Sequence, residues 1–464
     1  MRNHNTLITK LFLLVSLMVT SATAAEKAPP MQVLFKNVNI FNGTENRLYE
    51  NYQVLVEANL IKEISAGEIP IDSKAVVIDG GGRTLMPGLV EAHAHLMLMG
   101  PSVPAMEANT TWEDFAIHAT KMAEMYLMQG FTTLRDAGGA NGGHRRAIDS
   151  GLIVGPRLYT SGALLGTRGG HADFANFTAP VGQSTNFSRL NMAQEADSVD
   201  EVKKFGRNNF RMGATQLKYM QSGGVLSLFD PWQLLAGSKD EIEAVVQVAG
   251  EYDSYVMAHS YRKEAMMSAL EAGVMSIEHG FGFDCEVAEV MKEKGAFITT
   301  NLTGFDPGIL EVPAVRDVPS SLAKAESAKA TFQNYLVNMN KCPVKRAFQT
   351  DCVGSVAACN VQIAYEKHLN NKFFGSFAAL VAMTSVGGEL VALSGDFMNP
   401  YRKGKLGVIE QGAYADLLLL DGNPLENFSV VGAGDKWFDA EPRAESPETI
   451  RIIMKDGVIY KNTL

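Results

Sequence analysis

Short runs rich in β-branched and apolar residues alternate with amphipathic stretches of helical period between residues 85 and 400. Short apolar runs closed by glycine or polar residues predict buried strands, whereas apolar residues spaced three or four apart predict helices. The predicted strands cover residues 85–97, 130–138, 157–165, 214–220, 254–260, 274–280, 296–302 and 346–352. Helical stretches such as 239–252 and 262–273 lie between them, so this part of the chain reads as repeated β-then-α units.

Eight such units predict an α/β fold, specifically a parallel (β/α)8 TIM barrel over residues 85–400. An open doubly wound sheet is the structural alternative, but no G-x-G-x-x-G follows the first strand. Residues 25–84 and 401–464 show alternating apolar and polar positions separated by Gly and Asn turns. We expect these two terminal segments to fold together as the halves of one small β-sandwich.

The first 24 residues have the pattern of a secretory signal peptide. Arg2 and Lys10 precede an apolar run that is too short to span a bilayer comfortably, and Ala22-Thr23-Ala24 is a plausible cleavage site. No later stretch has enough uninterrupted apolar residues for a transmembrane helix. The sequence therefore predicts a periplasmic or secreted protein with no transmembrane segment after cleavage.

Composition narrows the possible partners. The chain is 46% hydrophobic and 20% charged, with a net charge of −10 and no cluster of Lys or Arg, so nucleic acid is a poor candidate partner. A small molecule or dipeptide is the expected substrate, and a homo-oligomer is possible. Cys285, Cys342, Cys352 and Cys359 lack C-x-x-C spacing, which argues against a thiolate zinc site. In an oxidising compartment one disulfide can form, but the sequence does not select its partners.

Candidate metal ligands fall at the carboxyl ends of the predicted strands. His93 and His95 are two apart, so their imidazoles project from the same face of a strand, although nine histidines in 464 residues will sometimes fall close together by chance. In a parallel barrel all strand ends face one mouth, which is where catalysis occurs. The polar residues expected at that mouth are His93, His95, Lys218, His259, His279 and Asp351.

Imidazole and carboxylate ligands together suit zinc and related divalent ions. Four histidines and one aspartate exceed what one tetrahedral ion with an open position needs, and two ions require a bridging anion. A protonated Lys218 repels cations, and taken alone it reads as an ordinary lysine paired with a carboxylate. A desolvated lysine loses its proton more easily and can then add carbon dioxide to give a carbamate, which is an anion with two oxygens.

The motifs "MPGLVEAHAHLM", "GFTTLRDAGG", "QLKYMQSGGVLS", "AHSYRKEAM", "ALEAGVMSIEHG" and "GVIEQGAYADLLLLDGNPL" resemble the amidohydrolase superfamily. The similarity spans nearly the whole mature chain in the right order, and it is strongest to the branch of metal-dependent Xaa-Pro dipeptidases and imidazolonepropionase-like proteins. The resemblance implies that His93, His95 and Asp351 bind one metal ion and that His259 and His279 bind the other, with carboxylated Lys218 as the bridge. One departure follows Asp351, where "DCVGSVAACN" replaces a family pattern that often contains His-Gly and then Asn.

The function implied is that of an exported hydrolase with two divalent ions, expected to be zinc, that cleaves an amide bond by a metal-bound hydroxide. Asp351 would orient that hydroxide and pass its proton to the leaving amine. Dipeptides or N-acyl amino acids are the expected substrates; a cyclic amide or lactone and a non-catalytic binding protein remain as alternatives. His171 and Tyr261 are candidate substrate-binding residues, with Tyr219 and Arg168 as weaker ones, and the glycines of "QSGGVLS" indicate a close approach of the backbone to the site.

Overall fold

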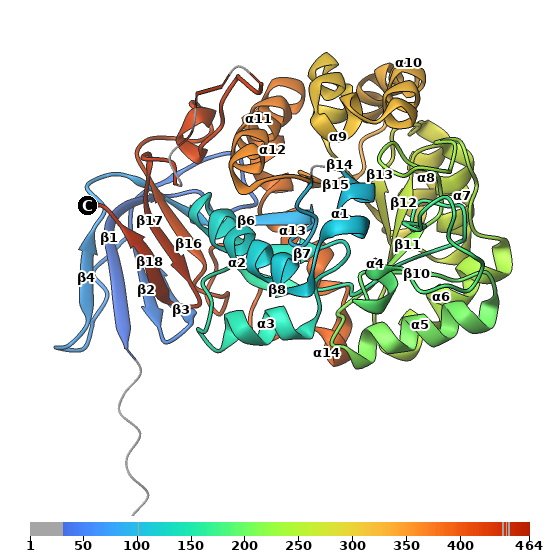
Figure 1. Cartoon of the computed structure of the whole chain (residues 1–464). Coiled ribbons are helices and arrows are strands. Elements are labelled where there is room, and N and C mark those ends of the chain that lie inside the picture. Colours follow the sequence, from blue (N-terminus) through green and yellow to red (C-terminus); the bar gives the residue numbers. More distant parts are fainter. Residues whose placement is uncertain (1–30, 101, 439, 442, 444–445) are drawn as a thin grey trace, which may run out of the picture.

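Strands from the two ends of the chain lie side by side in one sheet, as the blue and red arrows of Figure 1 show. The computed structural model describes residues 31–464 apart from 101, 439, 442 and 444–445, so the predicted signal peptide lies outside the described residues. The order of this terminal sheet is β18-β17-β16-β5-β1-β2-β3, with β4 paired to β1. Its strands are β1 (Gln32–Ile40), β2 (Tyr49–Glu57), β3 (Leu60–Ser65), β4 (Val76–Asp79), β5 (Thr84–Pro87), β16 (Leu417–Leu420), β17 (Ile450–Lys455) and β18 (Val458–Asn462).

The chain passes from the terminal sheet into the body of the molecule at Pro87-Gly88. The prediction of one strand over residues 85–97 was wrong at this point, because β5 pairs with β1 and β16 whereas β6 (Leu89–Ala94) pairs with β7 in the body. A Cβ atom on Gly88 would lie 2.0 Å from Thr132 Oγ1, so only glycine fits where the two sheets meet. Both strands are apolar, so hydrophobicity along the chain does not show where the strand of one sheet ends and that of the other begins.

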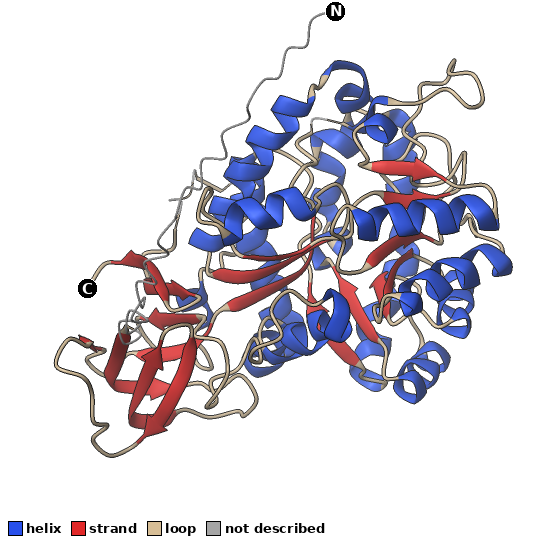
Figure 2. Ribbon diagram, turned by 90° about the horizontal axis from the view of Figure 1, so that it is seen from below, coloured by secondary structure: helices blue, strands red, loops and turns tan. Residues whose placement is uncertain are grey.

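Ten further strands form two parallel sheets in the body, and helices surround them in Figure 2. The smaller sheet has the order β6-β7-β8, and the larger has the order β10-β9-β11-β12-β13-β14-β15. The strands after β6 are β7 (Phe131–Asp136), β8 (Arg157–Tyr159), β9 (Leu164–Gly166), β10 (Ala193–Glu195), β11 (Leu217–Met220), β12 (Val256–Ser260), β13 (Ser276–His279), β14 (Phe297–Thr300) and β15 (Lys345–Phe348).

Each of the eight predicted strand regions contains a strand, but residues 157–165 hold parts of two, because the chain turns at Thr160-Ser161-Gly162 between β8 and β9. The predicted fold class is therefore confirmed as mixed α/β with a sheet built from both ends of the chain. Closure of the two parallel sheets into one barrel stays a prediction.

Amphipathic helices connect the strands. In α6 the capping box formed by Ser238 and Glu241 starts the helix, and its apolar face, which includes Ile242 and Val245, is buried. No helix among the described residues is long and apolar enough to cross a membrane. The helices are α1 (Val103–Asn109), α2 (Trp112–Met128), α3 (Gly142–Asp149), α4 (Asn186–Arg189), α5 (Val199–Arg211), α6 (Lys239–Glu251), α7 (Lys263–Ala272), α8 (Cys285–Lys294), α9 (Pro313–Arg316), α10 (Pro319–Lys341), α11 (Val356–Phe374), α12 (Ser376–Ala382), α13 (Ser385–Ala392) and α14 (Gly395–Met398), with 3-10 turns η1 (Leu302–Phe305), η2 (Pro307–Glu311) and η3 (Phe428–Val431).

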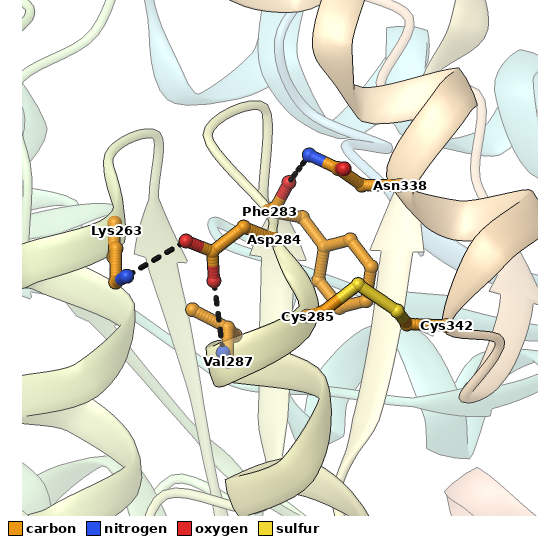
Figure 3. The surroundings of a disulfide bond; sticks show 7 residues. All are labelled: Lys263, Phe283, Asp284, Cys285, Val287, Asn338 and Cys342. Atoms are coloured by element: carbon orange, nitrogen blue, oxygen red, sulfur yellow. Dashed lines mark hydrogen bonds and ion pairs between the residues drawn. A yellow bond between two sulfur atoms is a disulfide. The ribbon is translucent and has the colours of Figure 1, made fainter.

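All four cysteines are paired in two disulfides, where the sequence left the pairing open. Cys285 at the start of α8 bonds Cys342 at the end of α10, and Figure 3 shows this pair beside the hydrogen bond from Asn338 Nδ2 to the carbonyl of Phe283. Cys352 bonds Cys359 within a short segment that follows β15. Spacing along the chain could not select these partners, because helix packing brings Cys285 and Cys342 together.

Candidate metal centre

Six polar residues that the sequence singles out line one cavity at the carboxyl ends of the parallel strands. They are His93, His95, Lys218, His259, His279 and Asp351, and they come from β6, β11, β12, β13 and the turn after β15. The chain positions them because each buried apolar strand ends at the same edge of its sheet. Within the described residues, ligand atoms of His93, His279 and Asp351 all lie within 4.8 Å of one another.

The rings of His93 and His95 are oriented so that Nε2 of each faces Asp351. His93 Nδ1 donates to Glu278 Oε2 at 2.6 Å and His95 Nδ1 donates to the Gly138 carbonyl at 3.2 Å, whereas His279 Nδ1 lies 3.1 Å from Asn301 Oδ1 and 3.0 Å from Gln349 Nε2. A hydrogen bond from Nδ1 fixes the tautomer that leaves the Nε2 lone pair available, as is usual for metal-binding histidines. His259 differs, because its Nε2 lies 3.1 Å from the Gly223 carbonyl.

Asp351 completes this group at the end of β15. Its Oδ1 lies 3.5 Å from His93 Nε2 and 3.4 Å from His95 Nε2, and its Oδ2 lies 3.7 Å from His279 Nδ1. Burial alone would raise the pKa of this carboxyl, but the neighbouring His279, His95 and His93 hold it well below its usual value. Asp351 is therefore ionised at neutral pH.

Burial keeps the imidazoles neutral. It lowers the pKa of His279 to about 4, and the pKa values of His93 and His259 also lie well below the usual histidine value, with burial as the largest cause. Neutral imidazoles and an ionised carboxylate are the protonation states in which these groups bind divalent metals. The donor set thus fits the metal centre that the sequence predicts.

Lys218 is buried among these ligands, with its Nζ 3.4 Å from His93 Nε2. Burial lowers the pKa of its ammonium group to about 8, although Glu278 and Asp351 oppose this shift. A lysine with this pKa loses its proton more readily near neutral pH than an ordinary lysine, and its neutral form can react as an amine. This environment differs from that of a surface lysine in an ordinary ion pair.

A buried acidic residue that sequence reasoning missed supports His93. Glu278 accepts from His93 Nδ1 and from Arg135 Nη2, which lies 2.9 Å from each carboxylate oxygen. Burial would raise the pKa of Glu278, but Arg135 and His93 hold it well below the usual value. Arg135 lies in the predicted strand 130–138 and Glu278 precedes His279, so the only available signal was a charged residue within each buried strand.

The candidate substrate-binding residues His171 and Tyr261 both line the cavity. His171 Nδ1 lies 2.7 Å from Ser227 Oγ and 3.5 Å from Asp230 Oδ2, and its ring stacks on that of His259 with centroids 4.2 Å apart. A Cβ on Gly224 would lie 2.1 Å from His171 Cε1, so the expected close approach of the backbone to the site is confirmed. Tyr261 packs against the rings of His259 and Phe281.

The two weaker candidates do not line the cavity. Tyr219 lies in the next position to Lys218 on β11, so its side chain points to the opposite face and is buried in the core between the sheet and the helices. Arg168 instead forms an ion pair with Glu195, with Nη1 and Oε2 2.9 Å apart. Assigning either residue to the substrate was wrong.

Apolar side chains form the outer wall of the same cavity. They come from the β6–α1 connection with the start of α1, the β9–β10 connection, the β11–α6 connection and the long segment between β14 and β15. Among them are Leu98, Val103, Phe174, Val225, Ile309, Val312 and Val315. The cavity therefore combines a polar floor with an apolar wall, the combination typical of a small-molecule site.

Comparison with known proteins gives the family. The amidohydrolase family model matches residues 84–459. Ochratoxinase of Aspergillus niger is 28% identical over 406 residues, covering 81% of this chain and 75% of the relative. The crystal structure of a prolidase complexed with N-methylphosphonate-L-proline is 31% identical, with a TM-score of 0.82 and coverage of 93% of this chain and 100% of that one.

A crystal structure of a Xaa-Pro dipeptidase with bound methionine is 26% identical, with a TM-score of 0.78, and covers 93% of this chain and 100% of its own. These matches agree with the resemblance seen in the sequence motifs. They also exclude the alternative of a non-catalytic binding protein. The chain belongs to the amidohydrolase family, in its Xaa-Pro dipeptidase-like branch, and is a hydrolase that acts on carbon–nitrogen bonds.

Proposed function

We propose that this protein is an exported, binuclear metal-dependent hydrolase that cleaves the amide bond of dipeptides or N-acyl amino acids. The observation that carries the proposal is the convergence of His93, His95, His259, His279, Asp351 and the desolvated Lys218 on the floor of one cavity. The prolidase and dipeptidase neighbours support an amide substrate that contains an amino acid.

The proposed centre holds two divalent ions, expected to be zinc. His93, His95 and Asp351 would bind one ion and His259 and His279 the other, with carboxylated Lys218 as the bridging ligand. The lowered pKa of Lys218 supports this assignment, because only the neutral amine adds carbon dioxide. The ions would supply Lewis-acid activation of water and of the scissile carbonyl.

The protein's own groups would move the proton and orient the substrate. Asp351 is ionised, so its carboxylate accepts a proton from the attacking water and then donates it to the leaving amine. His171, held through Nδ1 by Ser227, lines the cavity and would contact the substrate or the developing oxyanion. Tyr261 lines the same cavity and would contact the substrate carboxylate.

We further propose that the two parallel sheets close into one (β/α)8 barrel beneath this site. Hydrogen bonds between the sheets support closure at both seams. The amide of Asp351 donates to the His93 carbonyl at 3.0 Å, and the amide of Thr215 donates to the Thr160 carbonyl at 2.7 Å. Closure would keep the ligands on β6 and after β15 at a fixed separation.

A substrate panel tests the proposed reaction. The metal-loaded protein should hydrolyse N-acyl amino acids and dipeptides with a free carboxylate, and kcat/KM should fall when that carboxylate is converted to an amide. Equal kcat/KM for each acid and its amide would contradict the role given to Tyr261. Preferred turnover of a cyclic amide or lactone would replace the proposal with its imidazolonepropionase-like alternative.

A further inference from the structure

The Cys352–Cys359 disulfide directly follows the metal ligand Asp351. We propose that this bond is a positioning device, which holds Asp351 and the adjoining cavity wall in the arrangement that metal binding and turnover require. The inference rests on the proposed function of the metal centre. It gives a role to the segment "DCVGSVAACN", in which the sequence departs from the family pattern.

Asp351 needs such support because its backbone is in an unfavourable conformation. Its φ angle is +50°, in the left-handed region that a residue with a Cβ rarely adopts. Residues persist in such conformations only when the surrounding structure holds them there, and they concentrate at functional sites. Its own amide donates to the His93 carbonyl at 3.0 Å, which fixes it from the side of β6.

The residues on both sides of Asp351 are attached to helix α11. On one side, Gln362 Nε2 of α11 donates to the Thr350 carbonyl at 3.0 Å. On the other side, Cys352 bonds covalently to Cys359, which lies near the start of α11, and both cysteines are buried. The carboxylate that joins three histidines is therefore held to one helix by a hydrogen bond before it and a disulfide after it.

Helix α11 also holds the opposite wall of the cavity. Its buried Glu366 accepts the amides of Leu302 at 2.7 Å and Thr303 at 2.8 Å, and Thr303 lines the cavity. Val353, within the disulfide loop, lines the cavity as well. Through helix α11, the disulfide therefore fixes the positions of Asp351, Val353 and the η1 turn relative to one another.

The second disulfide provides a matched control. Cys285–Cys342 joins residues 57 apart in sequence, whereas Cys352–Cys359 joins residues 7 apart. If disulfides acted only by constraining the unfolded chain, the longer loop would stabilise the protein more. Neither Cys285 nor Cys342 lines the cavity, so that pair tests the effect of losing a disulfide without disturbing the site.

The experiment compares the variants Cys352→Ala/Cys359→Ala and Cys285→Ala/Cys342→Ala. Zinc affinity is measured by competition with a chelator, alongside Tm, kcat and KM. We expect the first variant to lose roughly 10- to 100-fold in zinc affinity or kcat, the range seen when support of metal ligands is removed. The second should keep both near wild type while losing more in Tm. Wild-type zinc affinity and kcat in the first variant would overturn the proposal. Losses of zinc affinity and kcat that follow the decrease in Tm in both variants would overturn it as well.

If the first variant does not fold, reduction of the folded wild-type enzyme gives the same test. Tris(2-carboxyethyl)phosphine supplies two electrons and becomes its oxide with an oxygen atom from water, and each disulfide becomes two thiols. Alkylation and mass spectrometry then identify which pair is reduced. Metal release should accompany reduction of Cys352–Cys359 and not of Cys285–Cys342; full metal content after reduction of both contradicts the proposal. A wild-type protein that binds no divalent metal would instead refute the proposed function.

Discussion

Glu278 is the residue on which the orientation of His93 depends. Its carboxylate joins Arg135 to His93 Nδ1 in a fully buried network that also includes Thr299, whose Oγ1 donates to Glu278 Oε2 at 2.7 Å. A charged acceptor fixes the imidazole tautomer and increases its basicity toward a metal. Every hydrogen bond to the ionised Glu278 is charge-assisted, but only the one from the Arg135 guanidinium joins two full charges.

We predict that Glu278→Gln lowers metal affinity or kcat roughly 10- to 100-fold, because an amide is a weaker acceptor and can present its NH2 group to the imidazole. Thr299→Val is the matched control, since it removes one uncharged donor from the same carboxylate, together with the contact of Thr299 Oγ1 with Gln349 Oε1. It should have a much smaller effect. Chelator competition and steady-state kinetics measure both variants, and equal metal affinity in Glu278→Gln and wild type would refute the role given to this carboxylate.

Helix α2 contains a histidine whose burial makes the stability of the molecule depend on pH. His118 Nε2 is buried without a hydrogen-bond partner among the residues described, and burial lowers the pKa of this imidazole to about 4. The unfolded chain binds this proton near pH 6.5, so between about pH 6.5 and 4 the unfolded state holds more protons than the folded one. Stability is full above this window and falls as the pH drops through it.

Replacing this histidine should therefore weaken the acid sensitivity. Metal-free wild type should lose about 1 kcal/mol more unfolding free energy between pH 7 and 5 than His118→Gln, after allowance for the partial exposure of the ring. Urea unfolding at the two pH values measures the difference. Equal losses of unfolding free energy in wild type and His118→Gln would mean that His118 is protonated equally in the folded and unfolded states.

The elements show which features the sequence can reveal. Strand regions and the polar residues that line the cavity at their ends were predictable, because an apolar run followed by histidine or aspartate is a local signal. The break at Gly88 was not, since its cause is contact with Thr132 across two sheets. The same holds for the Cys285–Cys342 bond and for Arg135 with Glu278, whose partners are far apart in the chain and meet only after packing.

At the scale of the whole molecule, the two disulfides agree with an oxidising environment. They add to the signal-like pattern of residues 1–24 in favour of export. We predict that the protein recovered from the periplasm or medium begins near Ala25 or Glu26. Mass spectrometry of its N-terminal peptide checks this, and recovery of the exported protein with Met1 intact would contradict cleavage.

The central claim is a binuclear centre bridged by carboxylated Lys218, and metal stoichiometry of Lys218 variants tests it most directly. The buried amine lies beside His93 and is expected to supply two anionic oxygens as the carbamate. Arginine stays protonated and forms no carbamate, so Lys218→Arg should bind fewer than two ions per chain and lose activity, as should Lys218→Ala. A small carboxylate such as acetate or propionate should partly restore the alanine variant by occupying the vacated bridge. Elemental analysis that finds two ions per chain and full activity in Lys218→Arg would contradict the account.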